Sequence, residues 1–298
     1  MSGDVQFFIE LTTNGVLTGL MYSLVAVGFV LIYKSTDAIN FAQGEFCMIA
    51  AIVIASTAAL YDFPLWLAIL TGMIFMLVFN WGLERVVLRP MIGRDVVSII
   101  MATIGLALIL RGIGPLVFGA ETRLIDLPIE QAPIIWGPFF VAPIDVLGAG
   151  ISILFLAAFG WFFLKSRKGV AMRAVADSHQ VSMAMGINVE RYFAVAWMLA
   201  GFVAMLGGIV WGNAIGADAQ LAALGLKVFP VVILGGLDSI IGVVVGGIII
   251  GVVEAISAGY LDPYVGGGTK DFVPYVLMIV ALMIRPYGMF GKPTIERI

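Results

Sequence analysis

The sequence predicts an all-α polytopic membrane protein with eight to nine transmembrane or re-entrant helices. Two observations lead to this fold class. Hydrophobic residues make up 61% of the 298 positions and charged residues 12%, whereas about a quarter of the residues in a soluble domain are charged. Many apolar residues also form runs near the length at which a helix can cross a bilayer with its backbone polar groups paired. We expect one transmembrane permease domain over residues 1–298.

Nine apolar segments are candidate membrane helices. The segment 221–236 is short, so it either crosses the bilayer or re-enters, and this choice leaves the count at eight or nine. The nine segments are residues 8–33, 46–60, 64–83, 96–118, 143–164, 192–213, 221–236, 239–259 and 272–284.

The N-terminal segment is expected to stay in the protein as the first membrane helix. Its first ten residues, MSGDVQFFIE, are acidic. They lack the basic region and the small-residue cleavage site of a signal peptide.

The distribution of Lys and Arg predicts the orientation of the helices, because cytoplasmic loops are enriched in these residues. With the N-terminus outside and nine crossings, twelve of the sixteen basic residues fall inside. The loop 165–191 and the C-terminus then lie in the cytoplasm, and the acidic, proline-rich loop 119–142 lies outside. Eight crossings would move one terminus to the other side. The twelve residues are Lys34, Arg85, Arg89, Arg94, Lys165, Arg167, Lys168, Arg173, Arg191, Arg285, Lys292 and Arg297.

Glycine is abundant, with 36 residues, and is dense between positions 234 and 255. Gly242 and Gly246 are four residues apart, and so are Gly247 and Gly251. Such pairs let two helix backbones approach closely in lipid. We interpret them as helix-packing contacts in preference to a pore lining.

Two regions share the pattern of an apolar segment, a polar or glycine-rich break and a second apolar segment. They are residues 8–60, with the break at 34–45, and residues 221–259, with the break at 235–239. Paired interrupted helices in a transporter point to its translocation site. Ionisable residues inside membrane segments are also functional candidates, with snorkelling or pairing as the structural alternative. The pathway candidates are Asn40, Gln43, Glu45, Arg111, Lys227 and Glu254.

The segment INFAQGEF, residues 39–46, predicts the start of the second membrane helix. Asn40 as N-cap and Gln43 three residues later would form a capping box, and Glu45 would complement the helix dipole. Gly44 would allow another element to approach closely. This structural interpretation needs no ligand. The functional interpretation is that a helix start at the membrane interface binds an anionic group or forms a gate.

The loop 165–191 is the longest polar stretch, and it predicts a short helix. Asp177 as N-cap and Gln180 would form a capping box, and Gly186 lies where a helix ends on a left-handed glycine. About two turns of helix are unstable alone in water. The apolar residues of this helix share one face, which is expected to bind a partner surface. They are Val181, Ala184 and Met185.

The inventory of reactive residues argues against an enzyme. The only histidine, His179, lies in the loop 165–191 and is expected to face water, so the sequence has neither an HExxH zinc site nor a Ser–His pair within the membrane. No GxxxxGK[ST] motif occurs, so the chain has no P-loop for ATP. The single cysteine, Cys47, is expected to be a small core residue. We expect no metal site, and the net charge of −3 implies no nucleic-acid surface.

Six motifs extend over nearly the whole chain. They are NGVLTGLMYSLVAVGFVLIY (14–33), INFAQGEF (39–46), ERVVLRP (84–90), MRAVADSHQVSMAMGINVERYFAVAWMLAG (172–201), VILGGLDSIIGVVVGGIIIGVVEA (232–255) and RPYGMFGKP (285–293). On these motifs the chain resembles the membrane permeases of bacterial high-affinity branched-chain amino acid ABC transporters, specifically the first, or H-type, of the two permeases. The family commonly has histidine where this chain has Gln43, which puts in doubt any role carried over to that position.

The resemblance implies an importer of several subunits in the bacterial inner membrane. A periplasmic binding protein would deliver the substrate, and a homologous permease would pair with this chain, as a heterodimer in preference to a homodimer. Two cytoplasmic ATPases would bind ATP and magnesium, while this chain would bind no cofactor. The loop 172–186 matches the family's coupling element, which docks into the ATPase. The coupling residues would be Arg173, Ala174, Asp177, Val181, Ala184, Met185 and Gly186.

Three functions remain open. The first is ATP-driven import of branched-chain or other hydrophobic amino acids. The second is the same machine importing urea, short amides, or aromatic or dicarboxylic acids, which related permeases serve. The third is an ATP-independent facilitator or channel, which would have no use for a docking helix.

Overall fold

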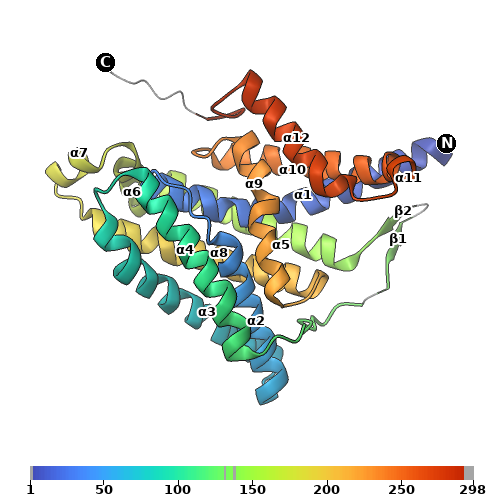
Figure 1. Ribbon diagram of the computed structural model, residues 1–298, viewed down its shortest axis with the longest axis horizontal. Helices are drawn as coiled ribbons and strands as arrows, with labels where there is room; N and C mark the ends of the chain where they lie inside the picture. Colours follow the sequence, from blue (N-terminus) through green and yellow to red (C-terminus); the bar gives the residue numbers. More distant parts are fainter. Residues whose placement is uncertain (1–2, 131, 137–138, 292–298) are drawn as a thin grey trace. The chain divides into compact units, whose positions relative to one another are not determined.

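The computed structural model describes residues 3–130, 132–136 and 139–291, and helices dominate this part of the chain (Figure 1). All nine predicted apolar segments are helical, so the all-α prediction is confirmed. They correspond to α1 (Gly3–Thr36), α2 (Gln43–Tyr61), α3 (Leu65–Leu83), α4 (Val96–Phe118), α5 (Pro143–Lys165), α8 (Val189–Ala214), α9 (Leu224–Gly235), α10 (Ile240–Tyr260) and α12 (Thr269–Ile284).

Seven helices in the described part of the chain are long and apolar enough to cross a membrane, namely α1 to α5, α8 and α10. Helix α9 has only 12 residues, and the 3₁₀-helix η3 (Ala219–Ala223) precedes it. At 1.5 Å per residue, α9 is about 18 Å long, against about 30 Å for the hydrocarbon core. Helix α12 has 16 residues.

Several shorter elements have no counterpart among the predicted ones. Helix α3 continues into a π-helical turn and then a 3₁₀ turn, and the loop 165–191 contains two helices instead of one. A two-stranded antiparallel hairpin pairs Ile134 with Val141. The elements without a predicted counterpart are η1 (Glu84–Leu88), η2 (Arg89–Met91), β1 (Ile134–Trp136), β2 (Phe139–Val141), α6 (Arg167–Asp177) and α11 (Asp262–Val265), whereas α7 (His179–Ala184) is the helix predicted for the loop 165–191.

Side-chain oxygen atoms cap the N-termini of several helices, because the first N–H groups of a helix have no partner within it. The Asp95 carboxylate accepts hydrogen bonds from the hydroxyl and the backbone N–H of Ser98 at the start of α4, and these bonds hold the pKa of Asp95 below its usual value. The caps of α6, α7, α8 and α10 are Ser166, Ser178, Asn188 and Ser239.

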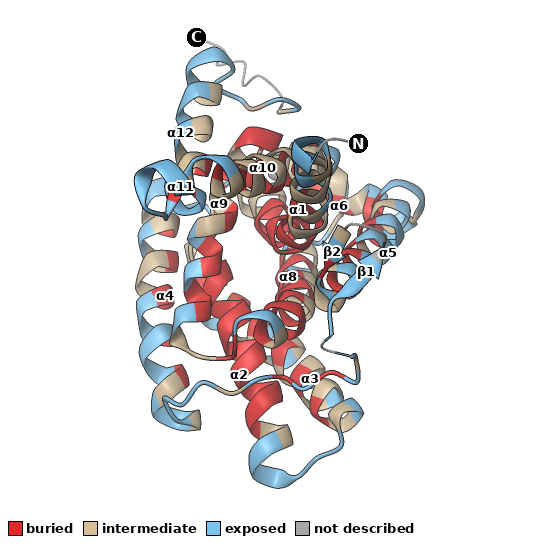
Figure 2. Ribbon diagram, turned by 90° about the vertical axis from the view of Figure 1, so that its right-hand side faces the viewer, coloured by how far each residue is buried: buried red, intermediate tan, exposed pale blue. Residues whose placement is uncertain are grey.

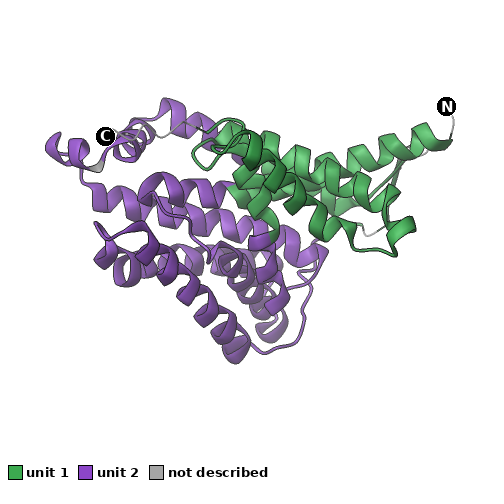
Figure 3. Cartoon of the chain, turned by 45° about the horizontal axis from the view of Figure 1, so that its top comes forward, with its two compact units in different colours: residues 1–26, 129–154, 227–298 green, residues 27–128, 155–226 purple. Residues whose placement is uncertain are grey.

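The chain forms two compact units, each made of segments from separate parts of the sequence (Figure 3). Unit 1 comprises Met1–Ala26, Ile129–Leu154 and Lys227–Ile298, and unit 2 comprises Val27–Pro128 and Phe155–Leu226.

The core of unit 2 lies between α2 and its neighbours. Helix α2 packs against α3, α4, α8 and η3 and is buried continuously from Gln43 to Ser56 (Figure 2). The ring of Phe46 meets the ring of Trp197 edge to face, with centroids 6.0 Å apart. Cys47 is fully buried here, as predicted for a small core residue.

In unit 1, the close packing of α1 and α10 depends on glycine. A Cβ atom on Gly19 would lie 2.3 Å from the carbonyl oxygen of Gly247, and one on Gly15 would lie 2.7 Å from that of Gly251. The two helices are antiparallel, because the residue numbers of the contacting pairs change in opposite directions. The packing interpretation of Gly247 and Gly251 is therefore confirmed.

The second glycine pair packs α10 against α9. A Cβ atom on Gly242 would lie 2.1 Å from the carbonyl oxygen of Gly235, and one on Gly246 would lie 2.6 Å from that of Val231. The chain after α12 returns to the same turn, where the backbone N–H of Met289 donates to the Leu234 carbonyl at 2.8 Å. This contact gives the motif RPYGMFG a structural role.

Candidate functional site

The loop 165–191 is attached firmly to the helices on either side of it. Gly169, near the start of α6, lies against the end of α5, where a Cβ atom would be 2.5 Å from the Phe162 carbonyl oxygen. Further along α6, Val175 is 1% exposed and packs with Val189 and Phe193 of α8. The loop therefore cannot move far without moving the ends of α5 and α8.

Helix α7 begins one residue later than predicted. Ser178 is its N-cap and accepts the backbone N–H of Val181, whereas Asp177 is the last residue of α6. The predicted capping box of Asp177 and Gln180 is wrong, because the chain between α6 and α7 is extended at Ser178 and this residue takes the cap.

The end of α7 is as predicted. Gly186 has a φ of +79°, the left-handed conformation that favours glycine. Its N–H donates to the Met183 carbonyl at 3.0 Å, and the N–H of Ile187 donates to the Ser182 carbonyl at 2.9 Å. These two bonds form a Schellman motif, which holds the last turn of this six-residue helix in place.

The predicted apolar face of α7 points outward. Val181 is 62% exposed and Met185 is 77% exposed, and Ala184 between them is exposed as well. Met183 extends the exposed apolar surface, whereas Ser182 faces inward and is buried. We call the four exposed residues the α7 face.

The other predicted coupling residues lie on α6. The guanidinium of Arg173 lies over the Phe163 ring, 5.7 Å from its centroid, and donates to the Leu164 carbonyl at 3.3 Å. Arg173 therefore braces α6 against α5. Ala174 is half-buried, Asp177 is exposed, and the exposure of the His179 side chain lies outside the described part of the structure.

A group of three charged residues joins the start of α8 to the end of α3. Arg89 pairs with the buried Glu84 and with Glu190, each at 3.1 Å. Glu190 is in the first turn of α8, directly after the loop 165–191. Sequence analysis missed this group, because Glu84 and Arg89 are five residues apart, a spacing that aligns side chains on a π-helix and not on an α-helix.

Two pathway candidates in the segment 39–46 do not form the predicted capping box. The side-chain oxygen Oδ1 of Asn40 accepts the N–H of Ala42 at 3.1 Å, and α2 starts at Gln43 without a side-chain cap. The Gln43 amide points instead towards α8, where it donates to the Ala200 carbonyl at 3.5 Å. This side chain fills the space left by Gly28, where a Cβ atom would lie 2.0 Å from the Gln43 Nε2.

Gly44 behaves as predicted and allows a close approach. A Cβ atom on it would lie 2.2 Å from the Ala222 carbonyl oxygen and 2.7 Å from the backbone nitrogen of Gly225. The starts of α2 and α9 therefore meet backbone to backbone in unit 2.

Glu45 and Arg111 form an ion pair between α2 and α4, with the Arg111 Nη2 atom 2.7 Å from the carboxylate. The Glu45 side chain is 4% exposed and the Arg111 side chain is 46% exposed. Arg111 therefore compensates a buried charge and remains accessible from outside unit 2.

Lys227 and Glu254 form the corresponding pair in unit 1. The ammonium of Lys227 lies 2.9 Å from the Glu254 carboxylate and 3.4 Å from that of Asp271 on α12. The hydroxyl of Tyr22 donates to Glu254 at 3.2 Å. The other oxygen of Glu254, Oε2, is buried and has no hydrogen-bond partner among the described residues. Tyr22 and Asp271 were not predicted, since they come from α1 and α12, far away in sequence.

The four other charged or polar contacts of note lie near the ends of the helices. In the loop 119–142, Arg123 donates to the Phe118 carbonyl at 2.7 Å and to Ser56 at 3.0 Å. In α11, Asp262 accepts from the hydroxyl and the N–H of Thr269, and these bonds keep the pKa of Asp262 below its usual value.

No group of three His, Cys, Asp or Glu residues that could hold a metal ion occurs among the residues described.

Comparison with known proteins gives one consistent result. A family model described as the permease component of the branched-chain amino acid transport system matches residues 11–282. The high-affinity branched-chain amino acid permease LivH of Salmonella typhimurium and that of Escherichia coli K12 are each 31% identical, with 100% of both chains covered. BraD of Pseudomonas aeruginosa is 28% identical over 99% of both chains.

A solved structure has the same fold at low sequence identity. PsaBC from Streptococcus pneumoniae, in complex with a Fab, has a TM-score of 0.53 and 11% identity, and the match covers 93% of each chain.

Proposed function

Because this chain belongs to the permease-component family of branched-chain amino acid transport systems, we propose that it forms the membrane path of an ATP-driven importer for branched-chain or other hydrophobic amino acids. It is a multi-pass permease subunit of the inner membrane and not an enzyme. Permeases of such importers work with ATPases and with a solute-binding protein. The substrate is carried over from the relatives with 28–31% identity over essentially the full chain.

The observation that carries the ATP-driven part of the proposal is the α7 face. Its exposed methionine and valine side chains stand on a helix that is too short to be stable alone, and a Schellman motif and the buried part of α6 fix its position. A small, rigid, apolar projection is suited to insertion into a groove of another protein. We assign that groove to an ATPase.

The group of Glu84, Arg89 and Glu190 supports a route from this docking surface into the membrane. A displacement of the loop 165–191 acts on the first turn of α8, where Glu190 lies. Arg89 connects this turn to the π-helical end of α3. Local π-helical turns are often found at functional sites. In this proposal, ATPase closure shifts α8 relative to α3.

The orientation that we propose has the N-terminus outside and the C-terminus in the cytoplasm, with nine crossings. The antiparallel packing of α1 and α10 supports it. If α9 crosses, α10 is the eighth crossing and runs opposite to the first, whereas a re-entrant α9 would make the two parallel. The distribution of Arg and Lys agrees, although Lys292 and Arg297 lie outside the described residues.

Within unit 2 we place the translocation path beside the buried Glu45–Arg111 pair, and within unit 1 beside the buried Lys227–Glu254 pair. In each pair the acid is buried and the cation is reachable, with 46% of Arg111 and 29% of Lys227 exposed. Ionisable residues at such depth are costly unless they serve transport or structure. Asn40 and Gln43, which precede Glu45 in the sequence, are fully buried. We therefore propose that they position α2 and do not contact the substrate. A homologous second permease would close the path on its other side, as a heterodimer.

Transport by the complete complex tests the substrate assignment. The permease, its partner permease, the ATPases and the binding protein are reconstituted in liposomes, and the uptake of leucine, isoleucine, valine, urea, a short amide and an aromatic acid is measured. We expect the three aliphatic amino acids to be taken up and to compete with one another. Uptake of urea, the amide or the aromatic acid without leucine uptake would show that the same machine serves another substrate class.

A further inference from the structure

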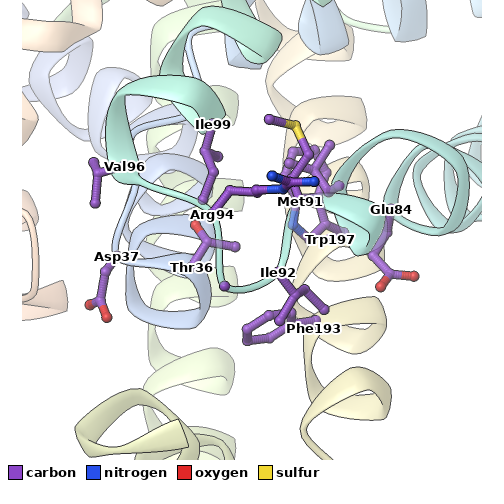
Figure 4. Close-up of a pocket in the computed structure, with 12 residues that line it drawn as sticks. Thr36, Asp37, Glu84, Met91, Ile92, Arg94, Val96, Ile99, Phe193 and Trp197 are labelled. Carbon is purple, nitrogen blue, oxygen red and sulfur yellow. The ribbon is translucent and has the colours of Figure 1, made fainter.

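A pocket of about 190 Å³ opens within unit 2, at the basic ends of α3 and α4 (Figure 4). The end of α1, the η1–η2 segment and the starts of α4 and α8 surround it. Most of its lining is apolar, with Met91, Ile92, Val96, Ile99 and Trp197 among the contributing residues.

The pocket contains one cation without an ion pair among the described residues, and the nearby Asp95 carboxylate, whose charge it feels, is hydrogen-bonded to Ser98. Arg94 lines it, and its guanidinium has neither a hydrogen bond nor an ion pair with any residue in the described ranges. Both oxygens of Glu84 are engaged by Arg89, at 3.2 and 3.1 Å. The carboxylate of Asp37, the other acid in the lining, points away from Arg94 (Figure 4).

A second polar group in the lining has no partner. The side chain of Trp197 is fully buried, and its indole nitrogen has no acceptor among the described residues. A buried N–H without an acceptor destabilises the fold, and an occupant with oxygen atoms would supply an acceptor. The pocket therefore offers two donors, one charged and one neutral, within apolar walls.

The position of the pocket indicates what kind of molecule would fit it. It lies between the end of the candidate span Leu65–Met91 and the start of the candidate span Val96–Phe118, so we expect it near the boundary between hydrocarbon and headgroups. Ile92 and Val96 at the rim are 41% and 46% exposed, and Ile99 and Trp197 lie deeper and are buried. A fitting molecule has an anionic group at the level of Arg94 and a flexible apolar chain below it.

We propose that this pocket binds an anionic phospholipid, with the phosphate on Arg94 and the upper part of one acyl chain along Met91, Ile99 and Trp197. Basic pockets between membrane helices on the cytoplasmic side recognise lipid headgroups in this way. A free hydrophobic amino acid fits less well, because its ammonium group finds no unengaged carboxylate pointing into the pocket. The site is independent of the proposed substrate path.

Native mass spectrometry on the complete transporter complex tests the site. The complex is purified in detergent with phosphatidylglycerol or with phosphatidylcholine, and the lipid retained is counted for the wild-type protein, Arg94→Gln and Arg191→Gln. Arg191 is the matched control, since it is an exposed arginine on the same side of the chain and outside the pocket. We expect Arg94→Gln to weaken retention of phosphatidylglycerol about fivefold and Arg191→Gln to leave it unchanged.

A second measurement locates the lipid. Phosphatidylglycerol with brominated acyl chains quenches nearby tryptophan fluorescence, and the part of the quenching that is lost in Trp197→Phe reports this pocket. That part should be present with brominated phosphatidylglycerol, weak with brominated phosphatidylcholine and reduced in Arg94→Gln. Equal retention and quenching with both lipids, or an Arg94→Gln protein that behaves like the wild type, would overturn the proposal. So would relief of the quenching by millimolar leucine, because the occupant would then be the free amino acid.

Discussion

At the scale of single residues, the buried acids of this protein are held by cations from other helices or turns. Glu84, Glu45 and Glu254 are all buried, and their partners are Arg89, Arg111 and Lys227. A carboxylate at this depth stays charged only when it is paired and hydrogen-bonded. The first role of these ion pairs is therefore to stabilise the fold, and any role in transport is additional.

Substitution of Arg111 tests whether the Glu45–Arg111 pair stabilises the fold. Arg111→Gln leaves Glu45 buried without its cation, and we expect the unfolding free energy to fall by about 1–3 kcal/mol. This is less than the about 3–5 kcal/mol of a fully buried pair, because the Arg111 side chain is partly exposed. The double variant Glu45→Gln/Arg111→Gln should recover most of the loss in thermal unfolding of the purified protein. Glu121→Gln, on a side chain that is 88% exposed, is the control. A double variant as unstable as the single one would contradict the account.

Glu190→Gln tests coupling at the residue that contacts Arg89. The change removes the link to α8 and leaves the Arg89–Glu84 pair intact. We expect severalfold less substrate transported per ATP hydrolysed by the reconstituted complex. The melting temperature should hardly change, because an exposed ion pair contributes only about 0–1 kcal/mol.

Glu190→Asp keeps the charge and should restore part of the coupling, which a purely steric role would not predict. If transport per ATP in Glu190→Gln equals that of the wild type, Glu190 has no part in transmission.

The sequence predicted which charged residues lie within the membrane helices better than it predicted their contacts. Glu45, Arg111, Lys227 and Glu254 were all found, because charge inside an apolar run is visible in one dimension. The capping boxes of Asn40–Gln43 and Asp177–Gln180 were wrong, because tertiary contacts and the extended backbone at Ser178 override local patterns. The partners of a charge on another helix cannot be inferred from local spacing.

At the scale of elements, close helix packing in unit 1 depends on residues without a side chain. Gly247→Ala places a Cβ atom 2.0 Å from the Ser23 hydroxyl and 2.5 Å from the Gly19 carbonyl oxygen. We expect a loss of about 1–3 kcal/mol in unfolding free energy, measured as a lower melting temperature. Gly105→Ala on α4 is the matched control, since nothing lies within 4 Å of its Cβ position. Equal melting temperatures for the two variants would rule out the packing role.

The α7 face can be tested as a docking surface. Val181→Glu and Met185→Glu add a charge to side chains that are 62% and 77% exposed, so the fold should tolerate them. An apolar groove on the ATPase would not tolerate the added charge. We therefore expect binding of the ATPase to the detergent-solubilised permease to weaken about tenfold or more.

Val170→Glu adds the same charge to a valine that is 50% exposed on the neighbouring helix α6, outside the α7 face, and should bind the ATPase normally. ATPase binding that is lost in all three variants, or in none, would contradict the assignment of the face.

The boundaries of long helices were predictable, and those of the connections were not. The predicted segment 96–118 coincides with α4, and 143–164 ends one residue before α5 does. Apolar runs bounded by Pro, Gly and charge determine such ends locally. Helix α6 and the π-helical turn η1 were missed, since four of the eleven residues of α6 are charged and η1 depends on the pairing of Glu84 with Arg89.

At the scale of the whole molecule, the sequence led to the fold class and the family, while the crossing count needed the structure. Composition and span length predicted the membrane fold, and the match over residues 11–282 shows the family. Charge counting left eight or nine crossings open, because α9 is short. The antiparallel contact of α1 with α10 joins residues far apart in sequence, and it supports the proposed crossing of α9.

The central claim is that this permease imports its substrate only when an ATPase drives it through the loop 165–191. The most direct test is uptake of radiolabelled leucine, delivered by the binding protein, into liposomes that hold the permease pair with and without the ATPases. The account predicts uptake against a gradient with ATPases and ATP present, and none when either is omitted. Leucine flux down its gradient through the permease pair alone would contradict it and identify a facilitator.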